Sequence, residues 1–171
     1  MSILITRDTT VIIQGITGRE AVTMTREGMD YGTRIIGGVT PGRGGREIHG
    51  VPVYDTVEAI TCKSRVDASV VSVPPAFTRD AVFEALEAGI KLVVIVTENI
   101  PRGEVAQMVE FADQRGARII GPNCLGIISP GEAKMGGVGG PAENTRQAYS
   151  KGEIGVMSRS GGMTTEIART L

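Results

Sequence analysis

The stretch Gly15–Ile16–Thr17–Gly18–Arg19–Glu20 decides how the chain is organised. A β-branched apolar run, Val11–Ile13, precedes it, and a helical pattern that starts at Ala21–Met24 comes after it. Strand, glycine turn and helix in this order direct the free N–H groups of the first helical turn beyond the end of the strand. The helix dipole adds partial positive charge there, so the pattern predicts a cradle for a phosphate. An ordinary strand–helix turn also uses glycine, so the rest of the sequence decides between the two interpretations.

Composition excludes several classes of protein. The chain has 171 residues, 41% of them apolar, and a net charge of −1, which suits a domain with a real core and disfavours nucleic acid and anionic membranes as partners. Aromatic residues make up 4%, and no apolar run approaches the ~20 residues that cross a bilayer. The apolar part of the N-terminus is too short, and the segment too polar, for a signal peptide. Cys62 and Cys124 do not have the C-x-x-C spacing that is typical of metal sites and redox-active pairs. We expect reduced thiols, no metal site, and a cytoplasmic location, or the mitochondrial matrix in a eukaryote.

Apolar runs alternate with helical patterns along most of the chain. This alternation, with short loops, predicts an α/β fold: a Rossmann-like, doubly wound parallel sheet. Thr78 is expected to cap the third helix and Gly89 to end it. The predicted strands are 11–14, 34–39, 51–54, 68–73, 91–97 and 117–121, and the helices between them are 19–31, 56–63, 78–88 and 102–115.

Ligands of such sheets bind beyond the carboxyl ends of the strands. The predicted binding rim therefore consists of the loops 15–20, 40–45, 73–77, 97–99 and 122–124.

The pattern changes after residue 130. Residues 131–151 are polar and glycine-rich, which indicates a linker, whereas Glu153–Met157 is typical of a strand. Ser158–Gly162 forms a second glycine turn ahead of a helical pattern. A strand and one short helix cannot bury their own apolar faces. We therefore predict a nucleotide-binding domain over 1–131, a linker over 132–152, and over 153–171 the start of a truncated second, flavodoxin-like domain.

The residues after the second strand narrow the class of nucleotide. A dinucleotide fingerprint needs G-x-G-x-x-G and a later carboxylate for the ribose, but this chain has G-x-x-G and then GGVTPGR over 37–43. Arg43 instead suits an additional phosphate on the ribose, as in NADP or coenzyme A, and the spacing does not separate these two. Arg43 and Arg46 also fit an ordinary solvated loop.

Long segments of the chain resemble the α subunit of succinyl-CoA synthetase, the nucleotide-dependent succinate–CoA ligase. The segments are MSILI at 1–5, QGITG at 14–18, YGTRIIGGVTPGRGG at 31–45, GIKLVVIVTENIP at 89–101 and RIIGPNCLGIISPGE at 118–132. The end of the chain, IGVMSRSGGMTTE at 154–166, resembles the start of the second domain of that subunit. Its SRSGGM motif is similar to that of ATP-citrate lyase and citryl-CoA synthetase.

The resemblance implies coenzyme A as the cofactor. Its pyrophosphate would lie in the turn at Thr17–Glu20, and Arg43 stands where the family usually has a lysine. The implied cofactor-binding residues are Thr17, Gly18, Arg19, Glu20, Pro41, Arg43, Val73, Pro74, Phe77, Val96, Thr97, Glu98, Asn123 and Cys124.

The resemblance also implies a reaction and a partner. A nucleoside triphosphate, bound by a β subunit, phosphorylates a histidine; the phosphate passes to a small carboxylic acid, and the thiol of CoA then displaces it. The implied substrate and phosphate residues are Ser158, Ser160, Gly161 and Thr165, the last at a position where the family often has a tyrosine. The one histidine, His49, is not at the catalytic position, which would lie beyond Leu171. We therefore expect the isolated chain to bind CoA without catalysis.

Two other functions stay open from the residues alone. One is a free-standing CoA-binding module with a regulatory role, although such a module would not need the turn at 158–162. The other is an NADP-dependent oxidoreductase, although the sequence offers no Tyr–Lys pair as a proton donor. Cys124 is interpreted as a packing residue beside the ligand, because no histidine can be placed next to it.

Overall fold

The computed structural model describes residues 3–171; Met1 and Ser2, at the start of the predicted first domain, lie outside the described residues. Its elements match the predicted alternation closely up to residue 120. The strands are β1 (Thr10–Gln14), β2 (Arg34–Val39), β3 (Glu47–Ile48), β4 (Val51–Tyr54), β5 (Ala68–Val71), β6 (Leu92–Ile95), β7 (Arg118–Ile120), β8 (Gly126–Ser129) and β9 (Ala133–Gly136). The helices are α1 (Arg19–Tyr31), α2 (Glu58–Thr61), α3 (Pro75–Glu87), α4 (Arg102–Gln114), α5 (Ala142–Ala148) and α6 (Gly161–Thr170).

The main sheet has seven strands in the order β3-β4-β2-β1-β5-β6-β7. Every neighbouring pair is parallel except β3–β4 at one edge. The parallel strands thus have the doubly wound order: the chain adds β2 and β4 on one side of β1 and then returns to add β5, β6 and β7 on the other side. The order of strands therefore reverses between β1 and β5. This reversal places the topological switch point at the carboxyl ends of β1 and β5, and it confirms the predicted fold class.

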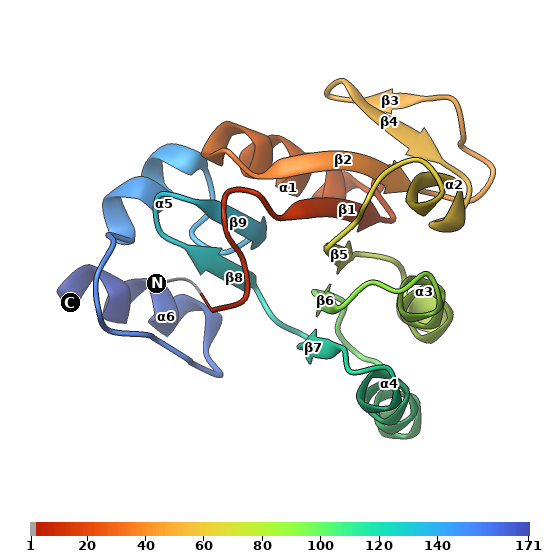
Figure 1. Ribbon diagram of the computed structural model, residues 1–171. Helices are drawn as coiled ribbons and strands as arrows, with labels where there is room; N and C mark the ends of the chain where they lie inside the picture. The colour runs from red at the N-terminus through yellow and green to blue at the C-terminus, as the bar shows by residue number, and fades with distance from the viewer. Residues whose placement is uncertain (1–2) are drawn as a thin grey trace.

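Both faces of the sheet are covered, which explains why its strands read as continuous apolar runs. Successive residues of β1 point to opposite cores. Val11 and Ile13 lie in the core that contains α1 and β9, and Ile12 lies in the core built with α2, α3 and α4. In Figure 1, α3 and α4 lie together beside β5, β6 and β7, away from α1 and the β8–β9 hairpin.

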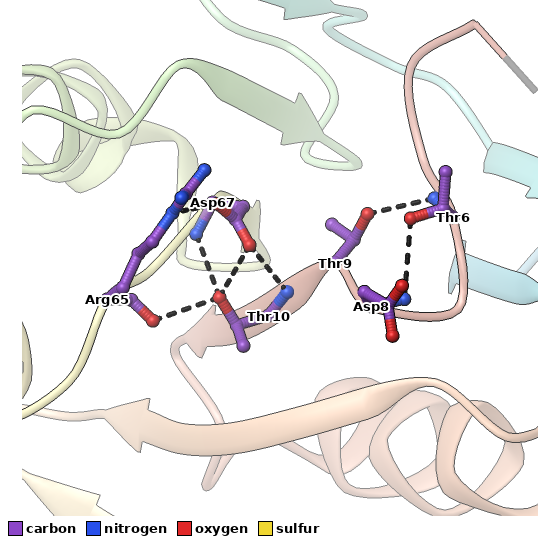
Figure 2. Close-up of polar contacts among 6 residues, drawn as sticks. All are labelled: Thr6, Asp8, Thr9, Thr10, Arg65 and Asp67. Carbon is purple, nitrogen blue, oxygen red and sulfur yellow. Dashed lines mark hydrogen bonds and ion pairs between the residues drawn. The ribbon is translucent and has the colours of Figure 1, made fainter.

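A polar cluster ties the sheet together at the amino ends of β1 and β5. The Asp67 carboxylate accepts hydrogen bonds from the backbone N–H of Thr10 at 3.0 Å and from its hydroxyl at 2.8 Å, and Arg65 donates to the same carboxylate at 2.7 Å (Figure 2). Burial alone would raise the pKa of Asp67, but these hydrogen bonds and the arginine charge together hold the pKa below its usual 3.8. The cluster lies at the amino ends of the strands, whereas the predicted rim lies at their carboxyl ends.

The third helix starts earlier than predicted. It begins at Pro75 with Pro74 as its N-cap, and Thr78 is buried inside the helix, where its hydroxyl donates to the Pro74 carbonyl at 3.2 Å. A proline costs nothing at the first helical position, because that N–H would have no helical partner.

The predicted linker 132–152 carries regular structure instead. It contains β9, which pairs antiparallel with β8, and α5, which contacts α1. The hairpin packs on α1 near the helix's end: the Thr33 hydroxyl donates to the Lys134 carbonyl at 2.6 Å and accepts from the Lys134 N–H at 2.9 Å. All residues of β9 are buried, so this segment is part of the core.

The side chain of Lys134 is fully buried within this hairpin region. Its ammonium lies 3.3 Å from the Glu27 carboxylate on α1 and donates to the Gly140 carbonyl. Burial lowers the pKa of Lys134 from its usual 10.5, and the charge of Glu27 opposes this shift. The pair joins the hairpin electrostatically to α1.

The predicted strand at Glu153–Met157 is wrong. Residues 151–160 are exposed and belong to neither a helix nor a strand, although α6 begins at about the predicted place. The apolar residues Ile154 and Met157 in this segment are 68% and 99% exposed. A strand-like sequence does not form a strand where its backbone has no neighbouring strand to pair with.

Candidate functional site

The turn after β1 leaves backbone N–H groups free at the start of α1. Gly15 donates to the Val39 carbonyl at 2.7 Å, and Gly18 donates to the Gly15 carbonyl at 2.9 Å, which closes the turn. Gly18 is the N-cap of α1 and has no side-chain capping bond. Among the described residues, nothing accepts from the N–H groups of Arg19 and Glu20. These amides lie at the positive end of the helix dipole, which is the arrangement from which the sequence predicts a cradle for an anion.

Gly15 also sits at the switch point itself. Its φ is +83°, and a Cβ there would lie 2.3 Å from the Ser72 carbonyl oxygen, just past β5. Ser72 in turn donates its N–H to the Gln14 carbonyl at 2.9 Å. The two strand ends therefore approach so closely that only glycine fits between them.

The loops after β1 and β2 are joined by two threonines. The Thr17 hydroxyl donates to the Thr40 hydroxyl at 3.2 Å, and Thr40 donates on to the Val39 carbonyl at 2.8 Å. Pro41 and Arg43 come next, in an exposed loop. The structure thus places the predicted residues Thr17–Glu20, Pro41 and Arg43 on adjacent loops at one edge of the sheet.

The loops after β5, β6 and β7 form the other half of the rim. The Thr97 hydroxyl donates to the Val73 carbonyl at 2.8 Å, and the Asn123 N–H donates to the Thr97 carbonyl at 2.9 Å. Phe77, on the first turn of α3, is 62% exposed, which leaves its ring available to a ligand. Val73, Pro74, Phe77, Val96, Thr97, Glu98, Asn123 and Cys124 all lie on these loops or the helix start beside them.

Cys124 is half-buried at the end of this half. Its thiol donates to the Ile95 carbonyl at 3.2 Å. Burial raises the pKa of the Cys124 thiol above its usual 9.0, against a smaller opposing effect of backbone hydrogen bonds. It is therefore a neutral thiol at physiological pH, which suits packing better than nucleophilic attack.

The second glycine turn lies next to this corner. A Cβ on Gly161 would lie 2.5 Å from the Leu125 side chain, directly after Cys124. Ser158 accepts from the Ser160 N–H at 3.1 Å, and Thr165 pairs with the Tyr149 hydroxyl at 3.0 Å. Of the four residues that the resemblance assigned to substrate and phosphate, Thr165 therefore directs its hydroxyl to Tyr149 at the end of α5, while Ser158, Ser160 and Gly161 form the turn.

Asp55 and His49 are exposed residues on either side of β4. Asp55 accepts from the backbone N–H groups of Arg43 and Gly44, and Thr56, just ahead of α2, accepts from the Ala59 N–H at 3.2 Å. His49 lies in the turn between β3 and β4, at the edge of the sheet away from the rim, on a cavity of about 430 Å³ beside α1.

Strand order, the close approach at the switch point and the free amides define a nucleotide-binding domain of the Rossmann type. The chain belongs to the CoA binding domain family, whose model matches residues 6–99, more than half of the chain. The cofactor predicted from the sequence, coenzyme A, is thereby confirmed at the level of the family.

Relatives of known function extend the similarity over the whole chain. It is 42% identical over 171 residues to subunit alpha 1 of the ADP-forming succinate–CoA ligase of Archaeoglobus fulgidus, covering 100% of this chain and 57% of that protein. It is 46% identical over 167 residues to the ADP-forming sulfoacetate-CoA ligase subunit SqwL of Acholeplasma sp, covering 98% of this chain and 55% of that protein. The chain thus spans just over half the length of these relatives, and the resemblance to succinate–CoA ligase α subunits is confirmed.

Solved structures support the fold. ATP citrate lyase from Methanothrix soehngenii, in complex with citrate and coenzyme A, matches with a TM-score of 0.84 at 21% identity, over 98% of this chain and 29% of that one. None of the helices within residues 3–171 has the length and apolar character needed to cross a membrane.

Proposed function

We propose that the chain binds coenzyme A across the switch point, with the diphosphate at the start of α1. The observation that carries this proposal is the uncapped α1 terminus, where the N–H groups of Arg19 and Glu20 have no partner among the described residues. The family match covers this cradle and the loops after β2 and β5. Gly15 lets the ends of β1 and β5 approach closely beside this turn, and the guanidinium of Arg43 suits a phosphate.

We assign the remaining contacts by their place on the rim. The loop at Val96–Glu98 would meet the cofactor through its backbone, Pro74 and Phe77 would wall its adenine or pantetheine, and Asn123 and Cys124 would lie toward its thiol. Coenzyme A supplies a thiol that becomes the acyl acceptor.

Calorimetric titration with CoA, desulfo-CoA and NADPH tests this assignment. We expect CoA and desulfo-CoA to bind with similar affinity, because the cradle holds the diphosphate and not the sulfur. NADPH should bind much more weakly. Tight binding of NADPH without binding of CoA would overturn the proposal in favour of an oxidoreductase.

We further propose that the chain is the CoA-binding part of the α subunit of an ADP-forming acid–CoA ligase. Its relatives over the full chain are α subunits of succinate–CoA ligases and a subunit of a sulfoacetate-CoA ligase. The partner would be a nucleotide-binding β subunit, the acid would be succinate or a similarly small carboxylic acid, and a cytoplasmic or mitochondrial-matrix location fits these substrates. A phosphohistidine relay would need a histidine other than His49, because His49 lies away from the rim.

Two assays separate this ligase role from a regulatory CoA-binding module. The chain alone, given ATP, CoA and succinate, should make no succinyl-CoA and take no acid-labile phosphate from labelled ATP. The chain should also form a complex with a ligase β subunit that carries the ATP site. Turnover by the chain alone, or failure to associate with any such β subunit, would contradict the role proposed.

A further inference from the structure

The loop that carries Arg43 is held by one carboxylate. Asp55, the residue after β4, accepts from the Arg43 N–H at 3.1 Å and from the Gly44 N–H at 3.0 Å, both on Oδ1. The same Arg43 N–H also points to the Thr40 carbonyl at 3.0 Å. A Cβ on Gly44 would lie 2.5 Å from the other carboxylate oxygen, so the loop backbone rests directly on Asp55.

Little else supports the middle of this loop. Its ends are fixed to β4, where Thr40 donates to the Tyr54 carbonyl at 3.0 Å and Gly45 donates to the Val53 carbonyl at 3.0 Å. Between those ends the residues are exposed, and the loop borders a cavity of about 430 Å³ whose lining includes Gly44, Arg46 and Asp55. Within the loop, the Arg43 N–H bonds to the Thr40 carbonyl and the Arg46 N–H bonds to the Arg43 carbonyl at 3.4 Å, so Asp55 adds the side-chain support of the middle of the loop.

We propose that Asp55 is a positioning residue for recognition of the 3′-phosphate of coenzyme A. It fixes the backbone at Arg43, so that the guanidinium is presented to the rim in one arrangement. Hydrogen bonds to an ionised acceptor are stronger than those to a neutral one, which makes a carboxylate an effective brace for two amides. The inference rests on the proposed function, because it assigns a determinant of ligand choice within the same site.

The test compares CoA with dephospho-CoA, which lacks only the 3′-phosphate. In the unsubstituted chain, CoA should bind about 10-fold or more tightly than dephospho-CoA, as expected for a charge-assisted contact. Arg43→Ala should abolish this preference. Asp55→Ala should reduce it to about 3-fold or less, with dephospho-CoA affinity nearly unchanged, whereas Asp55→Asn, which keeps an acceptor, should retain most of it.

Gly44→Ala is a second variant that leaves the carboxylate in the chain. Its Cβ would displace the Asp55 side chain from the two amides, so it should also reduce the preference for CoA. In an Asp55→Ala background the same change should have little further effect, because the group it displaces is gone. If Asp55→Ala does not fold, Gly44→Ala and Asp55→Asn still carry the comparison.

The outcomes separate this inference from the proposed function. If the unsubstituted chain does not bind CoA, the proposed function fails. If CoA binds but dephospho-CoA binds equally well, or if Asp55→Ala and Gly44→Ala lower both affinities by the same factor, the role of Asp55 is refuted while CoA binding stands. A thermal unfolding curve for each variant shows whether a lowered affinity reflects loss of fold.

Discussion

Replacing Gly15 by alanine tests whether the close approach of β1 and β5 shapes the site. Gly89, which lies just after α3, is a matched control, because its φ of +85° is nearly the same as the +83° of Gly15. A Cβ at Gly89 meets nothing within 4 Å, whereas a Cβ at Gly15 would lie 2.3 Å from the Ser72 oxygen and 2.9 Å from the Val73 side chain. The two variants therefore share the backbone strain and differ in the overlap.

The magnitudes come from those two contributions. Placing an L-residue in the left-handed region costs about 1–2 kcal/mol, so both variants should lose about this much free energy of unfolding. The overlap at Gly15 involves backbone atoms of Ser72, which can move only by disturbing the bond from Ser72 to Gln14, and overpacking of this kind costs about 1–3 kcal/mol. We expect Gly89→Ala to lower the free energy of unfolding by about 1–2 kcal/mol and Gly15→Ala by about 2–5 kcal/mol.

Urea unfolding followed by far-UV circular dichroism measures the difference, because the chain has no tryptophan to report by fluorescence. CoA titration supplies the second measurement: affinity should fall about 10-fold or more in Gly15→Ala, since the cradle moves with the strand end, and should not change in Gly89→Ala. Equal losses of stability in the two variants, or an unchanged CoA affinity in Gly15→Ala, would show that the close approach of β1 and β5 does not shape the site.

Three further predictions concern single polar contacts. Asp67→Asn should lower the free energy of unfolding by about 1–3 kcal/mol at neutral pH. Because the folded state lowers the pKa of Asp67 below 3.8, this difference should be complete above pH 3.8 and disappear as the pH falls through the folded-state value, in urea midpoints measured from pH 7 to 2.5. Burial lowers the pKa of Lys134 below 10.5, so between the folded-state pKa and pH 10.5 the unfolded chain binds more protons than the folded chain. The free energy of unfolding should therefore rise as the pH approaches 10.5. Urea midpoints measured at alkaline pH should show this rise in the unsubstituted chain and not in Lys134→Met. Thr97→Val removes the hydrogen bond to the loop after β5 and should cost about 0.5–1.5 kcal/mol in urea unfolding at pH 7, whereas an unchanged midpoint would show that the rim does not depend on it.

The parallel sheet and the position of the loops at its carboxyl ends were predictable from the sequence because each depends on local signals. Apolar runs of strand length, separated by helical stripes and glycine stops, predict which segments are strands and which are helices. The parallel direction of strands joined by helices then brings their carboxyl ends to the same side of the sheet. The cradle at Gly15–Glu20 and the loop at Thr40–Gly45 could be located from that placement alone. The contact between Asp55 and the Arg43 loop could not, because an aspartate before a helix has the same local pattern as an N-cap.

The β8–β9 hairpin was missed because the glycines from residue 131 onward were interpreted as signs of a linker. A Cβ on Gly126 would overlap the Met135 carbonyl, and one on Gly136 would lie 2.6 Å from the Leu125 oxygen. These glycines allow two strands to approach tightly, which is the opposite of a flexible connection. The buried Lys134 added to the error, since a lysine ordinarily indicates a solvated position.

The reciprocal bonds between Thr33 and Lys134 bear on how this protein can be divided. A shortened version that stopped at residue 131 would strip α1 of its outer cover and leave Glu27 and the Thr33 hydroxyl without the groups that satisfy them. We expect such a truncation to lose solubility, whereas one that ends after Tyr149 should keep an intact, self-sufficient unit.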